Sequence, residues 1–353
     1  MDSPQLSTEE AVNKLVDKTK NTKLPQGLQD KLADMFAQLR INARSEQTFW
    51  TNYQSVSKYL NWVTSLPWFT ESQDILDLQF AHEKLNESHY GLDSVKDRIM
   101  EYISVLALQK NRHPEEKLRA PVMLFVGLVG TGKTTIAKSI ATVLGREIIR
   151  IPFGGLGDPL YLRGQSRIYS EAEPGAIIRG LAQCKTKNPV ILLDEIDRVA
   201  DDALNTIMGV LVELLDPEQN SHFTDHYLDY PFDLSQVFFC ATCNNTTRIA
   251  TAVMDRLEAI QMPSYNDEEK IAIGRDFIFP EALKENSLTV QDLVIKPEVW
   301  SNIVRPLGFD AGVRTLKRNI ERLCRKTAMV ILSGKEKQVI IDESNLKYYI
   351  PQW

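Results

Sequence analysis

Apolar side chains near the start of the chain recur every three or four residues, which is the spacing of one face of an amphipathic helix. One such stripe covers residues 28–39 and a second covers residues 49–63, before Pro67 interrupts the pattern. A further stripe over residues 92–106 has the same spacing. We therefore predict a helical N-terminal region over residues 1–70, followed by at least one more helix.

The pattern changes to short apolar runs in the middle of the chain. Residues 110–121 are charged and end at a proline, which predicts a solvated linker before the change. Five apolar runs rich in branched residues then alternate with helical spacing, at residues 122–127, 147–153, 189–195, 236–242 and 257–263. Apolar runs without polar alternation are typical of strands buried on both faces, as in a parallel sheet. The predicted fold class is α/β, with a parallel five-stranded sheet between flanking helices.

The strand pattern ends at Pro263, and helical spacing returns over residues 266–278 and 313–323. The last residues of the chain predict a short strand and the start of a helix. We interpret them as the start of a linker towards a domain that this chain does not contain. The predicted divisions are an N-terminal helical region (1–70), an α/β nucleotide-binding domain (71–263), a small helical lid domain (264–335) and the linker start (336–353).

Composition and charge argue against a membrane protein and against a nucleic-acid-binding protein. Hydrophobic residues make up 43% and charged residues 25% of the 353 residues, as in an ordinary soluble globular protein. No apolar run approaches the roughly 20 residues that span a bilayer, so no membrane partner is predicted. The net charge of −6 gives no general attraction to nucleic acid, which is therefore an unlikely partner.

The four cysteines and two closely spaced histidines are weak metal candidates. So few cysteines do not form a disulfide scaffold, and they favour a reducing compartment. Cys240 and Cys243 lie in an apolar run without a second pair, which favours buried thiols over zinc or redox chemistry. His222 and His226 lie four residues apart, but Pro231 and many aromatic neighbours favour a loop or hairpin over a zinc-binding helix.

The segment LFVGLVGTGKTTIA, residues 124–137, passes from a strand pattern through a glycine-rich loop into a helix pattern. It contains the full pattern G-x-x-x-x-G-K-[ST], whose backbone N–H groups surround a phosphate at a helix N-terminus. Lys133 would reach the outer phosphates of a nucleotide and Thr134 would ligate magnesium, while Leu128-Val129 would contribute mainly backbone. A glycine-rich turn without function is the alternative, which the strand and helix on either side disfavour. The candidate nucleotide-binding residues of this loop are Gly127, Leu128, Val129, Gly130, Thr131, Gly132, Lys133, Thr134 and Thr135.

Two acids end a buried strand about sixty residues downstream, in the segment VILLDEID. A neighbouring parallel strand could set both acids beside the phosphates. Asp194 would then hold magnesium, directly or through water, and Glu195 would act as the general base towards the attacking water. Two adjacent acids favour hydrolysis over transfer to a second substrate.

Three further polar residues are weaker candidates when taken alone. Asn244 ends the next strand and could orient the same water, although a strand-end asparagine is more often a turn former. Arg256 and Arg314 each precede an apolar run, and lone arginines are most often solvated or paired at the surface.

Several longer segments closely resemble the ATPase module of Lon proteases, namely YGLDSVKDRIMEYI, LGREIIRIPFGGL, ELLDPEQNSHFTDHYLDYPFDLSQV and GVRTLKRNIERLCRKTA. The likeness extends over residues 23–353. It implies an AAA+ P-loop NTPase sheet with a helical lid, ATP and Mg²⁺ as cofactors, a homo-oligomer in the form of a hexameric ring, and unfolded or damaged protein as substrate. The segments FTDHYLDYPFDLSQV and EAIQMPSYNDEEKIAI are most similar to the peroxisomal branch, which implies a peroxisomal matrix location, or a mitochondrial matrix as the alternative.

The resemblance also implies roles for individual residues. Asn244 corresponds to a polar sensor of the phosphates, and Arg314 corresponds to a second sensor on the lid. Arg256 corresponds to an arginine finger that reaches the ATP of a neighbouring subunit. Tyr90 and Gly91 match the segment that lines the adenine.

The residues that would contact a polypeptide depart from the family pattern. Tyr169 matches the aromatic residue of the first pore loop, but Ser170 follows it where the family has an apolar branched residue. Residues 203–207 lack both the G-D-P motif and the aromatic residue of the second pore loop. Leu128-Val129 replace two prolines of the phosphate loop. The resemblance therefore implies intact nucleotide chemistry and an altered grip on substrate.

Lon proteases cut peptides with a serine–lysine dyad in a domain that follows the lid, and this chain shows neither that domain nor another nucleophile motif. We interpret the chain as the ATP-hydrolysing unfoldase and translocase module of a Lon-type serine protease of protein quality control, without peptidase residues. It is either a piece of a longer protein or a natural variant. The alternatives are a regulatory or scaffolding AAA+ protein without proteolytic activity and a nucleic-acid-remodelling ATPase, which the acidic net charge disfavours.

Overall fold

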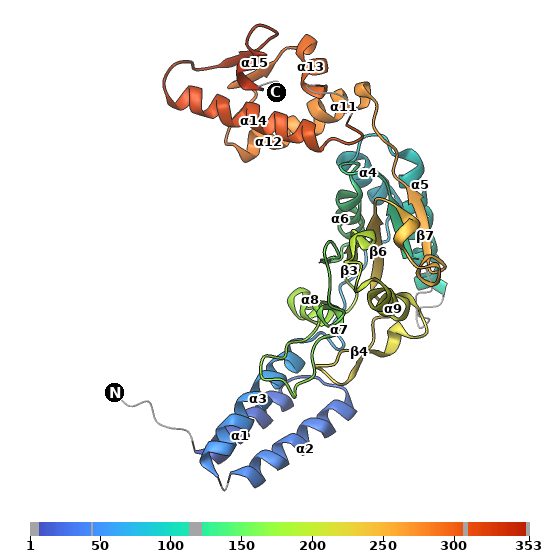
Figure 1. Ribbon diagram of the computed structural model, residues 1–353, viewed down its shortest axis with the longest axis vertical. Coiled ribbons are helices and arrows are strands. Elements are labelled where there is room, and N and C mark those ends of the chain that lie inside the picture. Colours follow the sequence, from blue (N-terminus) through green and yellow to red (C-terminus); the bar gives the residue numbers. More distant parts are fainter. Residues whose placement is uncertain (1–6, 44, 113–121, 306–309, 351–353) are drawn as a thin grey trace.

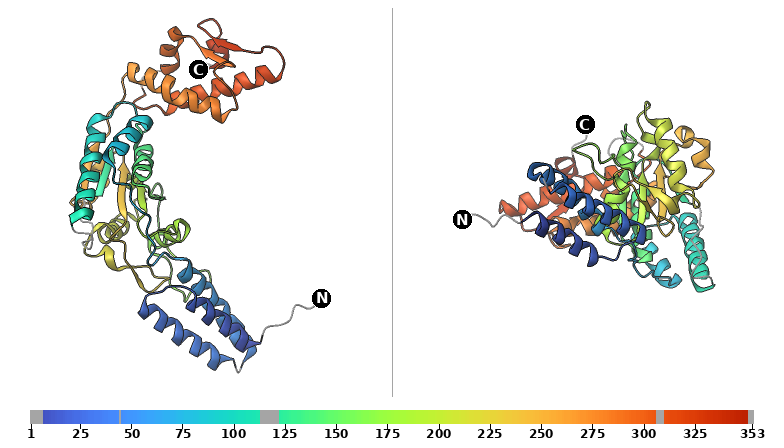
Figure 2. Two further views of the ribbon diagram at one scale, coloured as in Figure 1. Left: turned by 180° about the vertical axis from the view of Figure 1, so that it is seen from behind. Right: turned by 90° about the horizontal axis from the view of Figure 1, so that it is seen from below.

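The computed structural model describes residues 7–43, 45–112, 122–305 and 310–350. The chain forms three parts that follow one another along its long axis (Figure 1): N-terminal helices, a central sheet with its helices, and a C-terminal part. The view from behind shows the same order along a bowed molecule (Figure 2). None of the described helices combines the length and the apolar character that crossing a membrane requires.

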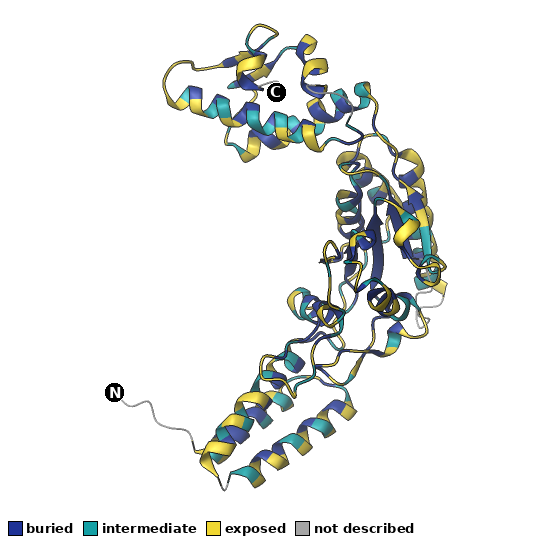
Figure 3. Ribbon diagram, viewed as in Figure 1, coloured by how far each residue is buried: buried dark blue, intermediate teal, exposed yellow. Residues whose placement is uncertain are grey.

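Three helices form the N-terminal part, namely α1 (Thr8–Lys20), α2 (Gln26–Asn42) and α3 (Glu46–Ser65). α1 begins with a reciprocal cap, in which the Glu10 N–H donates to the Ser7 hydroxyl and the Ser7 N–H donates to the Glu10 carboxylate. The predicted stripes over residues 28–39 and 49–63 are the buried faces of α2 and α3. Buried and exposed residues alternate along these helices accordingly (Figure 3).

Five parallel strands form the central sheet in the order β2-β3-β6-β1-β7. Their bounds are β1 (Val122–Val126), β2 (Ile148–Pro152), β3 (Val190–Asp194), β6 (Phe238–Cys243) and β7 (Leu257–Gln261). The predicted five-stranded parallel sheet is confirmed. β1, β3 and β6 are buried along their whole length, which explains why their sequences show no polar alternation.

Helices cover both faces of the sheet. Met123 and Phe125 of β1 share one core with α4 (Leu78–Ser88), α5 (Asp93–Arg112) and α6 (Lys133–Leu144). Leu124 and Val126 point to the opposite face, because side chains alternate along a strand. They share a second core with α8 (Ala176–Cys184), α9 (Leu204–Leu215) and the N-terminal helices. The N-terminal part is therefore continuous with this second core, which it joins through the contact of α3 with α8.

α5 is longer than the sequence pattern predicts. It continues to Arg112, so residues 110–112 of the predicted linker are helical, because no helix-breaking residue precedes Pro114. Residues 113–121 of that prediction lie outside the described residues. The predicted stripe over residues 92–106 supplies the buried face of α5.

The C-terminal part contains a small sheet, of which the sequence pattern predicted only one strand. Its helices are α11 (Asp267–Ile273), a π-helical turn (Gly274–Ile278), α12 (Phe279–Glu285), α13 (Trp300–Val304), α14 (Arg314–Leu332) and α15 (Leu346–Tyr349). β8 (Leu293–Ile295) pairs in parallel with β9 (Val339–Ile341). β9 corresponds to the short strand predicted in the tail, whereas β8 lies in a region where only helices were predicted. Strands of three residues are too short to show a periodic apolar pattern.

The end of the chain packs onto this part. The short strand and helix predicted after residue 336 are β9 and α15. Val339, Ile341, Leu346 and Tyr349 are buried in the same core as α14. The interpretation of 336–353 as the start of a linker therefore does not hold for residues 339–350, whose apolar side chains complete the lid.

Two smaller predictions concern residues beside the sheet. β4 (Phe223–Thr224) and β5 (Pro231–Phe232) form an antiparallel pair, which confirms a hairpin around His226. No group of three or more His, Cys, Asp and Glu side chains among the described residues is placed to hold a metal ion. Cys240 and Cys243 are buried free thiols, as predicted, and burial raises the pKa of Cys243 to about 12.

Candidate active site

Three neighbouring strands bring polar residues to one edge of the sheet. β1 leads into the glycine-rich loop and α6, β3 ends at Asp194, and β6 ends directly before Asn244. These strands are adjacent, in the order β3-β6-β1. Because they are parallel, their carboxyl ends lie at the same edge, and the residues that follow them form one site.

The glycine-rich loop needs its glycines for space and for backbone conformation. A Cβ atom on Gly127 would lie 2.8 Å from the Met262 Cβ, so no side chain fits there. Gly130 and Gly132 have φ angles of 85° and 95°, in the left-handed region that favours glycine. Leu128 and Val129 are 53% and 42% exposed, so their side chains take no part in the core beneath the loop.

The side chain of Lys133 folds back over the loop. Its Nζ donates to the carbonyl oxygens of Gly127, at 2.6 Å, and of Leu128, at 2.9 Å. It also donates to Asn244 Oδ1 at 2.9 Å. Burial lowers the pKa of the Lys133 ammonium, and the nearby acids oppose that shift. The structure thus joins the candidate lysine of one strand end to the candidate asparagine of the next.

Asp194 lies beside the hydroxyl of Thr134. Thr134 Oγ1 donates to Asp194 Oδ1 at 3.4 Å, and the buried Thr242 donates to the same oxygen at 2.6 Å. Arg150 of β2 donates through Nε to Asp194 Oδ2 at 2.7 Å. A hydroxyl and a carboxylate are hard oxygen ligands, so Thr134 and Asp194 fit the two protein positions that a phosphate-bound magnesium ion requires.

Glu195 holds an unusual backbone conformation. Its φ angle is 60°, which is uncommon for a residue with a side chain and costs conformational energy. The Glu195 N–H donates to Thr242 Oγ1 at 2.9 Å, which helps to hold this conformation. The side chain is 38% exposed and its Oε1 lies 3.5 Å from Arg198 Nη1, so the carboxylate is accessible to water.

Asp197 belongs to the site, although the sequence analysis assigned it no role. Its Oδ2 accepts the backbone N–H groups of Asn244, at 3.0 Å, and of Asn245, at 3.2 Å. The carboxylate is buried, and its Oδ1 has no hydrogen-bond partner among the described residues. Asp197 therefore fixes the end of β6 against the end of β3 and positions Asn244. Its place as the third acid of the segment VILLDEID is the signal that could have identified it.

The C-terminal part touches the phosphate loop through backbone atoms. The Val313 N–H donates to the Gly130 carbonyl at 3.0 Å. A Cβ atom on Gly312 would lie 2.4 Å from the carbonyl carbon of Gly130, so the two glycines are in direct contact. This turn places the exposed Arg314, the first residue of α14, next to the loop.

Comparisons with known proteins agree with this arrangement. Residues 123–265 match the ATPase family associated with various cellular activities (AAA), and residues 284–340 match the Lon protease AAA+ ATPase lid domain. The chain carries an AAA domain followed by a Lon-type lid. It is 43% identical to Lon protease 2 of Thermus thermophilus over 301 residues, which cover 84% of this chain and 37% of that protein. It is 39% identical to the Lon protease of Clostridioides difficile over 355 residues, which cover 98% of this chain and 43% of that protein.

These relatives establish homology to the ATPase region of Lon proteases. The chain spans well under half the length of the curated relatives that it matches. The two relatives named are bacterial proteins, and they give no support to a peroxisomal or mitochondrial location.

Tyr90 and Gly91 lie between the AAA domain and the Lon-type lid. The Tyr90 ring is 40% exposed and meets the ring of Phe277 edge to face, with 6.4 Å between the ring centroids. Gly91 and Leu92 both have φ angles of 58°, which turns the chain sharply before α5. The neighbouring His89 is buried, and burial lowers the pKa of its imidazole to about 4. Phe277 is a further aromatic residue at this boundary that the sequence analysis did not single out.

Arg256 lies at the opposite edge of the sheet of the AAA domain. Leu257 pairs with Val122 at the start of β1, whereas the phosphate loop follows Val126 at the end of that strand. Five residues of strand correspond to a separation of about 16 Å. Arg256 Nη2 instead contacts Asp216 Oδ2 at 2.7 Å. The structure therefore does not bring Arg256 to the nucleotide site of its own chain.

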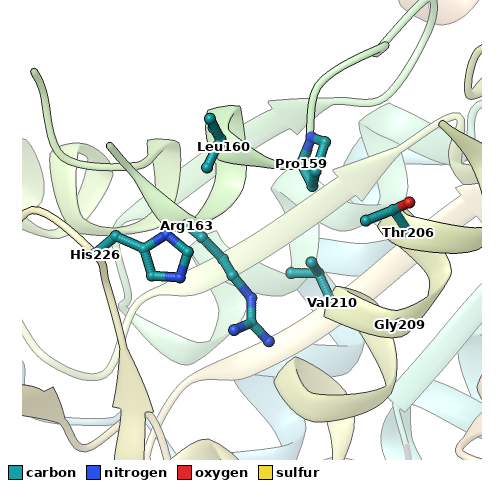
Figure 4. A pocket seen from close by; sticks show the side chains of 7 residues that line it. All are labelled: Pro159, Leu160, Arg163, Thr206, Gly209, Val210 and His226. Atoms are coloured by element: carbon teal, nitrogen blue, oxygen red, sulfur yellow. The ribbon is translucent and has the colours of Figure 1, made fainter. Parts of the chain in front are cut away.

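Tyr169 is not among the side chains that meet at the nucleotide residues, and within the described part of the chain its backbone bonds only to Ser166 and Ala172 of its own loop. Its side chain is 64% exposed, in the loop between α7 (Leu160–Arg163) and α8. A hollow of about 270 Å³ lies nearby, lined by Leu160, Arg163, Val210 and His226 among others (Figure 4). None of its lining residues belongs to the phosphate loop, so this hollow is separate from the nucleotide site.

Proposed function

We propose that this AAA module binds and hydrolyses ATP at the edge of the sheet where β1, β3 and β6 end. The observation that carries the proposal is the convergence of Lys133, Thr134, Asp194 and Asn244 from three strand ends. Lys133 Nζ lies 2.9 Å from Asn244 Oδ1, and Thr134 Oγ1 lies 3.4 Å from Asp194 Oδ1. These contacts combine the donors for a phosphate with oxygen ligands for a cation.

Each residue has a defined task in this proposal. Backbone N–H groups of residues 127–135 surround the phosphates, and Lys133 turns from its carbonyl partners towards the outer phosphate oxygens. Thr134 and Asp194 would hold Mg²⁺, which neutralises charge on the phosphate oxygens when it is bound. The exposed Glu195 carboxylate takes the proton of the attacking water, and Asn244 orients that water. Arg314 approaches from the lid, and Tyr90 with Gly91 borders the adenine.

We further propose that Arg256 acts on a neighbouring subunit. It lies at the edge of the sheet opposite to its own phosphate loop, so it can reach a nucleotide only across an interface between subunits. A heterologous interface of this kind generates a ring when its rotation closes, and the Lon resemblance favours a hexamer. Its ion pair with Asp216 would then hold the guanidinium until the neighbour is present.

The use of this hydrolysis is to pull unfolded or damaged polypeptide through the ring, with Tyr169 as a residue that grips the polypeptide. Homology to Lon proteases supports this role as the unfoldase module of an ATP-dependent protease in quality control. We propose that the AAA domain meets the lid near residue 263, and that the N-terminal helical region ends before residue 71. A peroxisomal matrix location, with a mitochondrial matrix as the alternative, rests on sequence resemblance alone.

A steady-state ATPase assay tests the proposed function. We expect the chain to hydrolyse ATP in the presence of Mg²⁺ and to do so several times faster when β-casein, an unstructured polypeptide, is added. Tyr169→Ala should remove the stimulation. A basal rate that β-casein does not change would contradict the polypeptide role and leave the ATPase role standing.

A further inference from the structure

The loop over residues 164–175 presents two adjacent apolar side chains to solvent. Ile168 is 82% exposed and Tyr169 is 64% exposed, at the tip of the loop. Contiguous exposed apolar side chains can mark a site of interaction with another polypeptide. The loop lies beside α3 of the N-terminal helices in both long views (Figures 1 and 2).

The neck of this loop is closed by a buried carboxylate. Asp225 is fully buried, and its Oδ2 accepts the Gly175 N–H at 2.7 Å. A Cβ atom on Gly175 would lie 2.0 Å from the Leu162 carbonyl oxygen, so the two ends of the loop touch. The base of the loop is therefore fixed, while Ile168 and Tyr169 at its tip remain exposed.

One side of the tip rests on Tyr59 of α3. The guanidinium of Arg167 lies 4.0 Å from the centroid of the Tyr59 ring, within the range of a cation–π contact. Tyr59 is itself fully buried, and its hydroxyl donates to the Leu228 carbonyl at 2.9 Å. Arg167, which directly precedes Ile168, is thus held by the buried and hydrogen-bonded side chain of Tyr59.

The other side of the tip is held by the neighbouring residue of α3. Lys58 Nζ donates to the Ala172 carbonyl at 2.9 Å and forms an ion pair with Glu173 Oε1 at 2.9 Å. Lys58 and Tyr59 are consecutive residues, and together they contact the loop on both sides of Ile168 and Tyr169. Both belong to a helix that shares the core of the central sheet.

We propose that α3 positions the Ile168–Tyr169 tip for contact with polypeptide, with Lys58 and Tyr59 as the positioning residues. This rests on the proposed function, in which the tip contacts polypeptide. Ordering a side chain or loop segment before it binds removes an entropic cost from the binding step. The N-terminal helices therefore raise the affinity for polypeptide without contacting it at these two residues.

Charge reversal at Lys58 tests this proposal in the full chain. Lys58→Glu places a carboxylate opposite Glu173 and removes the donor to Ala172. We expect amide hydrogen exchange within residues 166–172 to rise, because the loop loses two contacts with α3. We also expect the β-casein concentration for half-maximal ATPase stimulation to rise. The rise should be only about two- to fivefold, because an exposed ion pair contributes little free energy. The maximal stimulated rate should stay unchanged. The double variant Lys58→Glu/Glu173→Lys should restore part of both effects, and Lys20→Glu, on exposed α1 surface, should cause neither.

The outcomes separate this proposal from the function on which it rests. If amide hydrogen exchange in the loop of Lys58→Glu is unchanged, Lys58 does not hold the loop, and the proposal is wrong. Raised exchange with an unchanged half-maximal concentration, in a chain where Tyr169→Ala abolishes stimulation, would overturn the positioning role. If Tyr169→Ala leaves stimulation intact, the gripping role of the tip fails, and the positioning role fails with it.

Discussion

The ammonium of Lys133 lies 2.9 Å from the side-chain oxygen of Asn244, 111 residues further along the chain. Parallel pairing of β1 with β6 produces this contact, because both residues follow the carboxyl end of their strand. A lysine that is held by two carbonyl groups and an amide is ready to exchange these partners for phosphate oxygens.

The first prediction concerns this lysine. Lys133→Ala removes the charge that binds the outer phosphates, and we expect ATP affinity to fall by at least about a hundredfold, as when a buried charged partner is lost. The matched control is Lys138→Ala, which changes an exposed lysine of the same helix α6. Titration with a fluorescent ATP analogue measures both variants, and equal affinities would remove Lys133 from the site.

The second prediction concerns the contact between the lid and the phosphate loop. Gly312→Ala places a methyl group 2.4 Å from a backbone atom of Gly130, so the turn must move away and the Val313–Gly130 hydrogen bond breaks. We expect ATP hydrolysis to fall by about tenfold, the equivalent of one lost hydrogen bond and its geometry. Gly209→Ala on α9, where a Cβ meets nothing within 4 Å, should leave the rate unchanged. Equal rates for the two variants would mean that the lid contact is not needed.

The third prediction concerns Arg256. Alone, Arg256→Ala and Lys133→Ala should each be inactive, but a 1:1 mixture of the two chains should regain about a quarter of the wild-type activity, because only one interface in four then joins an intact lysine to an intact arginine. The pair with Asp216 is partly buried, with side chains 27% and 18% exposed, so the midpoint of thermal unfolding of Arg256→Ala is measured alongside to exclude inactivity through unfolding. The ATPase rate as a function of mixing time measures this effect. A mixture no more active than its parts would exclude action across the interface.

Much of this arrangement could be predicted from the sequence, and the reasons are physical. The central strands are apolar throughout because helices cover both faces of the sheet. Such an apolar run can be recognised from the local sequence, without knowing which strands lie beside it. The loop from Gly127 to Thr134 can also be recognised from the sequence, because phosphate binding needs glycines, a lysine and a hydroxyl at fixed spacing. Lys133, Asp194 and Asn244 meet because a parallel sheet aligns its carboxyl ends.

The residues that could not be predicted make contacts with residues far away in the sequence, and such contacts leave no regular spacing in their own segments. Arg150 reaches Asp194 from β2, and nothing in its own segment distinguishes it from a surface charge. Asp197 holds the N–H of Asn244, and its place as the third acid of VILLDEID is the only local signal for that role. β8 has only three residues and finds its partner β9 about 45 residues later. Such long-range pairs depend on how the lid packs, which apolar periodicity does not describe.

The fourth prediction is a pH dependence of stability. His89 is buried and its pKa is lowered to about 4, whereas an unfolded histidine titrates near 6.5. As the pH falls below 6.5 the unfolded chain binds a proton that the folded chain does not, so this stability is present above pH 6.5 and is lost between pH 6.5 and 4. The loss amounts to roughly 3 kcal/mol at most.

Urea unfolding at several pH values measures this effect. His89→Gln should flatten the decline of the midpoint between pH 6.5 and 4, and His82→Gln, at an exposed position of α4, should preserve it. Identical pH profiles of the wild type and His89→Gln would show that His89 is solvated in the folded chain.

Substitution of Glu195 tests the proposed active site directly, because it separates binding of ATP from its hydrolysis. Glu195→Gln keeps the shape of the side chain but cannot accept the proton of water at a carboxylate oxygen. In single-turnover experiments with ATP bound in the presence of Mg²⁺, we expect unchanged ATP affinity and hydrolysis slower by about 10²–10⁴-fold. Hydrolysis by Glu195→Gln at the wild-type rate would contradict the proposed active site.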